Sequence, residues 1–182
     1  MIRLLTGVTL FFISAGFQAQ AVLPDGADAA VLQERYGDWV VICQESKETA
    51  APQCTALQVQ TKAGVRVLSA ELRGDAEMSL TGKLTLPFGL ALAEGVTLSV
   101  DDKSLDTLHF STCVPEGCIV PVQWDKEQAK ELLKANKWTL TGKNSGDGAE
   151  TIELQLPVNG LDKALQRIQF LQGEKTDTPP SP

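Results

Sequence analysis

Apolar and polar residues alternate along most of the chain beyond residue 38. Leu84 and Leu86, for example, alternate with Lys83 and Thr85, and the same period recurs at 39–43, 68–73, 83–88, 96–101, 107–112, 138–141 and 151–158. A period of two predicts strands with one buried face and one solvent face. Because two such sheets can bury their apolar faces against each other, the pattern predicts an antiparallel β-sandwich.

Two segments depart from this period and predict short helices. The first, Asp125 to Asn136, opens with a capping-box pattern, since Gln128 stands three residues after Asp125. The second, 159–171, places four apolar residues at helical spacing, namely Leu161, Ala164, Leu165 and Ile168. We expect both helices to cover a sheet face or an end of the sandwich.

The N-terminus indicates export. Arg3 precedes an apolar run from Leu4 to Phe17, and Ala19 and Ala21 supply the small residues of a cleavage site. The run is shorter than the roughly 20 residues that a bilayer span needs. We therefore expect cleavage after Ala21, with cleavage after Ala19 as the alternative, and no membrane span in the mature protein. We expect a periplasmic location, with secretion or outer-surface association as alternatives.

These features divide the chain into four segments. We expect a signal peptide at 1–21, a leader segment at 22–35, a β-sandwich domain at 36–171 and a disordered Pro-rich tail at 172–182. The tail is polar and carries no apolar residue that could anchor it to a core.

The four cysteines favour two disulfides, because an exported chain folds where oxidised thiols persist. Three pairings are possible, and the local one, Cys43–Cys54 with Cys113–Cys118, is the simplest because each pair flanks turn-forming residues. A zinc site would need closer pairs than intervals of ten and four residues. Cys113 and Cys118 also lack the C-x-x-C spacing of redox proteins.

Charge and candidate chemistry exclude several functions. The chain carries a net charge of −7, and signal cleavage removes one Arg and no acid, so nucleic acid is not an expected partner. His109 is the only histidine, with no metal or triad partners. Asp101, Asp102 and Asp106 favour a solvated turn over a calcium site. We expect no catalytic, cofactor-binding or metal-binding residues.

The three tryptophans pose a separate question. Trp39, Trp124 and Trp138 could line a sugar-binding face, but all three fall on the apolar parity of their segments. Core packing is therefore the favoured interpretation.

Four motifs resemble one family of exported bacterial proteins, the invasion-associated locus B family. They are the run Tyr36–Cys43 with Cys54, then Leu86–Leu90, Gly95–Asp101 and Phe110–Cys118. The last is the most specific, and the resemblance extends from about Tyr36 to Ile168. It implies an immunoglobulin-like β-sandwich and, for some members, a link to bacterial invasion of host cells. It implies no catalytic residues.

The sequence thus predicts a non-catalytic extracytoplasmic protein that acts by contact with an envelope or host protein or glycan. The family resemblance adds support for host-cell invasion. A carbohydrate-binding β-sandwich of the cell envelope is the alternative. A hydrolase on a β-scaffold is disfavoured, because no nucleophile stands near a base in the motifs.

Overall fold

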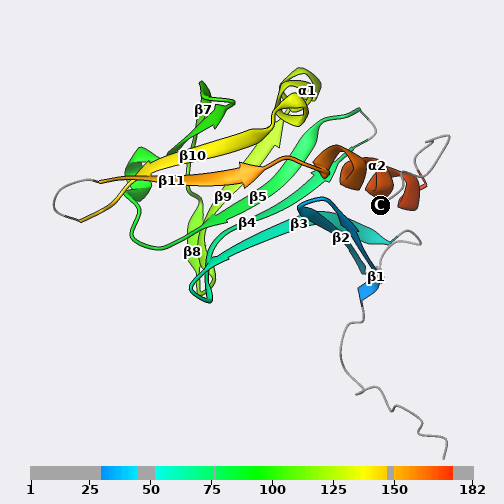
Figure 1. Ribbon diagram of the computed structural model, residues 1–182, viewed down its shortest axis with the longest axis horizontal. Helices are drawn as coiled ribbons and strands as arrows, with labels where there is room; N and C mark the ends of the chain where they lie inside the picture. Colours follow the sequence, from blue (N-terminus) through cyan, green and yellow to red (C-terminus); the bar gives the residue numbers. More distant parts are fainter. Residues whose placement is uncertain (1–29, 45–51, 76, 147–149, 174–182) are drawn as a thin grey trace, which may run out of the picture.

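The computed structural model describes residues 30–44, 52–75, 77–146 and 150–173, which form two antiparallel sheets and two helices (Figure 1). The strands are β1 (Ala30–Tyr36), β2 (Trp39–Gln44), β3 (Gln53–Lys62), β4 (Val65–Gly74), β5 (Leu80–Leu86), β6 (Val96–Val100), β7 (Lys103–Leu108), β8 (Thr112–Val114), β9 (Gly117–Trp124), β10 (Lys137–Lys143) and β11 (Thr151–Pro157). The helices are α1 (Lys126–Lys134) and α2 (Leu161–Leu171), with a short 3-10 turn η1 (Leu92–Glu94).

The larger sheet has the strand order β1-β2-β3-β4-β5-β9-β8, and the smaller has the order β11-β10-β6-β7. β1 to β5 follow one another as a meander, after which the chain alternates between the two sheets. Figure 1 shows the smaller sheet and α2 lying along the larger sheet. The expected antiparallel β-sandwich with two short helices is confirmed.

The core lies between the sheets and explains the position of every tryptophan. Trp39, Trp124 and Trp138 are each at most 2% exposed. The rings of Trp124 and Trp138 meet edge to face with centroids 5.5 Å apart, a favourable arrangement for aromatic pairs. The buried indole of Trp138 donates to the backbone oxygen of Leu132 at 3.0 Å. The tryptophans therefore form core, as their parity predicts, and no sugar-binding face.

Side chains of the larger sheet also bind the edge of the smaller one. The Gln60 amide donates to the backbone oxygen of Gln155 at 2.7 Å. The Trp39 indole donates to the backbone oxygen of Pro157 at 3.1 Å, and the Gln58 amide donates to the same oxygen at 3.3 Å. These bonds occupy backbone acceptors of β11 that have no neighbouring strand.

The two helices form where the sequence predicts them. The Asp125 side chain accepts from the Gln128 backbone N–H, and the Gln128 side chain accepts from the Asp125 backbone N–H, which completes the capping box of α1. The four apolar residues of α2 are buried against the larger sheet. Gly160 precedes α2 with φ +88°, and a Cβ there would lie 2.1 Å from the Tyr36 backbone oxygen. This close approach explains why the position is a glycine.

Three details differ from the sequence prediction. The alternating segment 107–112 is not one strand, because the chain leaves the smaller sheet after Leu108 and joins the larger sheet at Thr112. Phe88 follows β5 in a turn and is 59% exposed, so it does not join the core. The expected leader, 22–35, overlaps β1, which begins at Ala30.

The first 29 residues and the last nine lie outside the described part, so the signal and tail stay predictions.

Candidate functional site

Both disulfides link residues that stand directly opposite each other on neighbouring antiparallel strands. Cys43 of β2 is bonded to Cys54 of β3, with Cα atoms 4.0 Å apart. Cys113 of β8 is bonded to Cys118 of β9, with Cα atoms 3.9 Å apart. These are the local pairs that the sequence favours. The first bridge is buried at both cysteines, whereas Cys113 of the second is exposed at the sheet edge.

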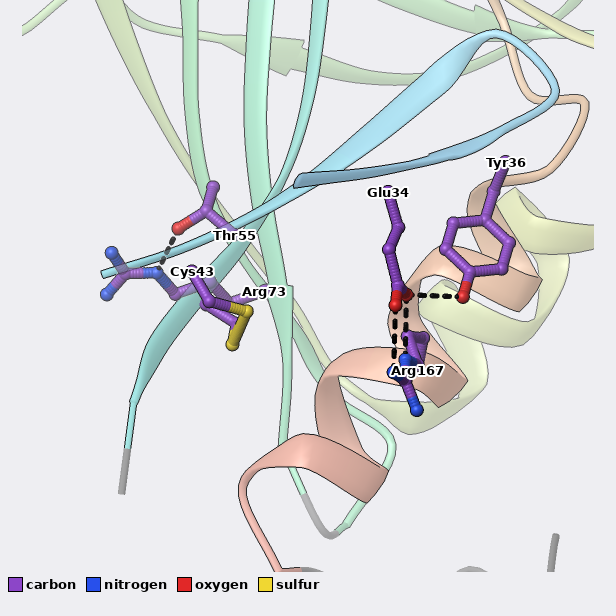
Figure 2. Close-up of a disulfide and its surroundings, with 7 residues drawn as sticks. Glu34, Tyr36, Cys43, Thr55, Arg73 and Arg167 are labelled. Atoms are coloured by element: carbon purple, nitrogen blue, oxygen red, sulfur yellow. Dashed lines mark hydrogen bonds and ion pairs between the residues drawn. A yellow bond between two sulfur atoms is a disulfide. The ribbon is translucent and has the colours of Figure 1, made fainter. Parts of the chain in front are cut away.

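A polar cluster joins the first strand to the last helix (Figure 2). The Arg167 guanidinium donates to both carboxylate oxygens of Glu34, at 2.7 and 2.8 Å, and the Tyr36 hydroxyl donates to Glu34 at 2.8 Å. The Arg167 hydrogen bonds hold the pKa of Glu34 below its usual range. Burial, assisted by the hydrogen bond to Glu34, raises the pKa of Tyr36 to about 12. A phenol that stays protonated and a carboxylate that stays ionised suit a structural role rather than acid–base chemistry. We call the cluster of Glu34, Tyr36 and Arg167 the clamp.

The remaining candidate residues do not converge on a chemical site. His109 is exposed in the link between β7 and β8. Asp101 and Asp102 form the turn between β6 and β7 with positive φ values of 44° and 68°. The Asp101 carboxylate accepts from the backbone N–H of Asn136 at 3.1 Å, and Asp102 pairs with Lys137 at 3.5 Å. Turn geometry and these partners account for the aspartates without calcium.

Two further features are absent from the described residues. No three His, Cys, Asp or Glu side chains in residues 30–44, 52–75, 77–146 and 150–173 stand together as metal ligands. Within the same ranges, no helix combines the length and apolar character needed to cross a bilayer.

One small apolar pocket lies where α1, α2 and the β4–β5 turn meet. It encloses about 80 Å³ and is lined by apolar groups of Leu80, Ala129, Leu133 and Leu165. Met78, with a positive φ of 65°, belongs to the turn at its rim and is 52% exposed. The volume suits a single aliphatic group rather than a cofactor.

A second hollow, of about 280 Å³, lies on the outer face of the larger sheet, the side turned away from the core. It is lined by residues of β3, β4 and β5, namely Thr55, Glu71, Arg73, Thr81, Gly82 and Lys83. Arg73 donates through Nε to the Thr55 hydroxyl at 2.8 Å (Figure 2), and Lys83 pairs with Glu71 at 3.1 Å. We call this hollow the outer groove.

Neither the outer groove nor the clamp was found from the sequence. Only the strand register places Thr81 opposite Arg73, and only the packing of β3 on β4 brings the Thr55 hydroxyl within hydrogen-bond distance of Arg73. Glu34 and Arg167 are 133 residues apart, and no local pattern connects them. Their proximity depends on α2 packing on β1.

Residues 39–169 match the family described as "Invasion associated locus B (IalB) protein". The chain belongs to the invasion associated locus B family. The match begins at β2 and ends within α2, so it includes every described strand except β1, both disulfides and the outer groove. The resemblance inferred from the four motifs is therefore confirmed.

Curated relatives and a solved structure agree with this assignment. An Invasion protein B homolog of Brucella abortus (strain 2308) is 41% identical over 153 residues, covering 83% of this chain and 86% of the relative. Invasion protein B of Bartonella bacilliformis is 34% identical over 157 residues, covering 84% and 81%. The crystal structure of invasion associated protein B from Bartonella henselae superposes with a TM-score of 0.72 at 29% identity, covering 79% of this chain and 98% of that one. These invasion associated locus B relatives carry names of invasion proteins rather than of enzymes.

Proposed function

We propose that this protein acts outside the cytoplasm, without catalysis, by contact with envelope or host components, and that it supports bacterial invasion of host cells. The observation that carries the proposal is family membership across the folded domain, with relatives named for invasion. Family membership does not say which surface of the protein makes the contact. The role is therefore tested by deleting the gene, which requires no knowledge of that surface.

The chemistry of the described residues supports a role in contact rather than catalysis. Catalytic groups need a pKa matched to their task and a partner within hydrogen-bond reach. Burial and Glu34 raise the pKa of Tyr36 to about 12, away from neutral pH, and its hydroxyl already donates a hydrogen bond to Glu34. His109 is exposed and has no hydrogen-bond or ion-pair partner among the described residues.

The location that we propose is the periplasm, and secretion or outer-surface association are the alternatives. The N-terminal apolar run supports export. Two disulfides support an oxidising compartment, because thiols of cytosolic proteins are kept reduced.

The test is a deletion strain of the parent bacterium, complemented with the full chain or with a form that begins at Val22 behind a new Met. We expect the deletion to lower recovery of intracellular bacteria severalfold in an uptake assay, and only the full chain to restore it. Growth and envelope-stress reporters are measured in parallel. They distinguish a specific role in invasion from a general role in maintaining the envelope. Unchanged uptake, or restoration by the form without residues 1–21, would overturn the proposal.

A further inference from the structure

A row of side chains crosses the outer face of the larger sheet, and all of its members except Ile42 of β2 can form hydrogen bonds. Register pairs place Gln33 opposite Ile42, Ile42 opposite Thr55, Arg73 opposite Thr81, and Thr81 opposite Gln123. The Arg73–Thr55 hydrogen bond joins the two halves of the row. Directly opposite residues share one face of a sheet. The row therefore spans β1, β2, β3, β4, β5 and β9, with the outer groove at its centre.

Arg73 is oriented by Thr55, and the outer end of its guanidinium has no partner among residues 30–44, 52–75, 77–146 and 150–173. The Nε–Thr55 bond orients the guanidinium plane, and no residue in the described ranges accepts a hydrogen bond from its two terminal nitrogens. Such a planar fork matches the two oxygens of a carboxylate. Lys83 adds a second cation, and Glu71 is the only carboxylate that lines the groove. The groove is thus locally positive in a chain whose net charge is −7.

Size and lining narrow the class of ligand. A hollow of about 280 Å³ lies near the lower end of small-molecule sites, which span about 300–1,000 Å³. Gly82 lines the groove with backbone alone, because a Cβ there would lie 2.0 Å from the Glu71 backbone oxygen. The hydroxyls of Thr55 and Thr81 flank the guanidinium, and the amides of Gln33 and Gln123 continue the row. These neutral groups suit a ligand rich in hydroxyls, whereas the acidic chain as a whole repels a polyanion.

We propose that the outer groove binds a saccharide that carries a single carboxylate, a uronic-acid-type sugar. Arg73 binds the carboxylate through its terminal nitrogens. Thr55 and Thr81 pair with ring hydroxyls, and Lys83 sets the local charge. No tryptophan stacks on the sugar ring in this assignment, because all three tryptophans are buried. It deepens the proposed function, on which it rests, by naming the envelope or host component that the protein contacts.

The experiment titrates the mature protein with methyl β-D-glucuronoside and follows its backbone amide signals by NMR. Methyl β-D-glucoside, which lacks only the carboxylate, is the matched neutral ligand, and inorganic phosphate is the matched anion. We expect the glucuronoside to shift amides of β3, β4 and β5, with affinity at least tenfold above both comparison ligands.

Variants test the assigned roles. Arg73→Ala should weaken glucuronoside binding at least tenfold, and Arg73→Lys should weaken it too, because an ammonium keeps the charge but loses the fork. Thr81→Val preserves the shape of the side chain but removes its hydroxyl, and it should weaken glucuronoside binding severalfold. This variant provides the test if the Arg73 variants fail to fold. Lys163→Ala on the exposed face of α2 is the control and should bind like the parent.

Four results would overturn the proposal: no binding, equal binding of the neutral glucoside, equal binding of phosphate, or undiminished binding by Arg73→Ala. Binding is measured on purified protein, so its failure does not depend on the uptake assay. A protein that binds the glucuronoside but whose deletion leaves uptake unchanged would refute the proposed function alone.

Discussion

At the scale of single residues, the two disulfides occupy equivalent positions in their ladders but differ in access. Cys43 and Cys54 are 1% and 0% exposed, whereas Cys113 is exposed on the edge strand β8. Thiol–disulfide exchange requires a thiolate to reach a sulfur atom. Access, rather than loop length, therefore decides which bridge opens first in the folded protein.

We expect limiting dithiothreitol to reduce Cys113–Cys118 well before Cys43–Cys54. Alkylation at timed intervals followed by peptide mass spectrometry reports each cysteine separately. The same reaction in denaturant, where both bridges are accessible, should show a much smaller difference in rate. Earlier labelling of Cys43 and Cys54 in the native protein would contradict the expectation.

Tyr36 offers a direct measurement, because it is the only tyrosine in the chain. Its folded pKa of about 12 lies above the ordinary value of 10.0, so the protonated phenol is favoured in the native state. Phenolate absorbance should rise with a midpoint near 12 in the folded protein and near 10 in denaturant. Circular dichroism at each pH checks that the fold persists, and a native midpoint near 10 would contradict the buried environment.

At the scale of elements, the clamp is the polar link between β1 and α2. Both partners are partly buried, with side-chain exposures of 18% for Arg167 and 22% for Glu34. Arg167 also lies over the Phe170 ring, 5.4 Å from its centroid. Because the ion pair is bidentate and partly buried, we expect it to contribute more to the free energy of unfolding than an ordinary surface ion pair does, on the order of 1–3 kcal/mol.

The clamp should lose its contribution in acid. Because the folded pKa of Glu34 is depressed, its stabilisation is fully present above the unfolded value of about 4.5 and is lost as pH falls through the folded pKa. We expect Glu34→Gln to lower the free energy of unfolding at neutral pH and to flatten its decline below pH 4.5. Urea titrations across this range measure both effects.

Glu153→Gln on the exposed face of β11 is the matched control for that series. It removes the same charge without a described partner, so it should leave the pH profile close to that of the parent. A Glu34→Gln profile that coincides with the Glu153→Gln profile would show that the clamp contributes nothing measurable.

At the scale of the whole molecule, the features that could be predicted from the sequence are those set by local patterns of residues. Alternation gave most strands, and the capping pattern of Asp125 and Gln128 gave α1. The transfer from β7 to β8 was missed because residues 107–112 keep their alternation while changing sheets. The outer groove was missed because it depends on the register of three neighbouring strands, β3, β4 and β5, which no single segment encodes.

Export also belongs to this scale, because it concerns the chain's first residues and its final location. We expect the mature protein to begin at Val22, since Ala19 and Ala21 supply the small residues of a signal cleavage site. N-terminal sequencing of the protein recovered from periplasmic extracts measures this. A protein that retains Met1 in the membrane fraction would contradict it.

The clamp has a consequence for how the chain is made. β1 is the first described strand and α2 is the last described element, so the Glu34–Arg167 contact forms only when α2 is present, whereas the β1–β2 hairpin is local. Contacts this distant in sequence form late and slowly. A nascent chain therefore lacks the clamp until α2 has been made. Under the export that we propose, such a chain would be easier to thread through a membrane pore than the finished fold, and the clamp would close in the compartment where the thiols oxidise.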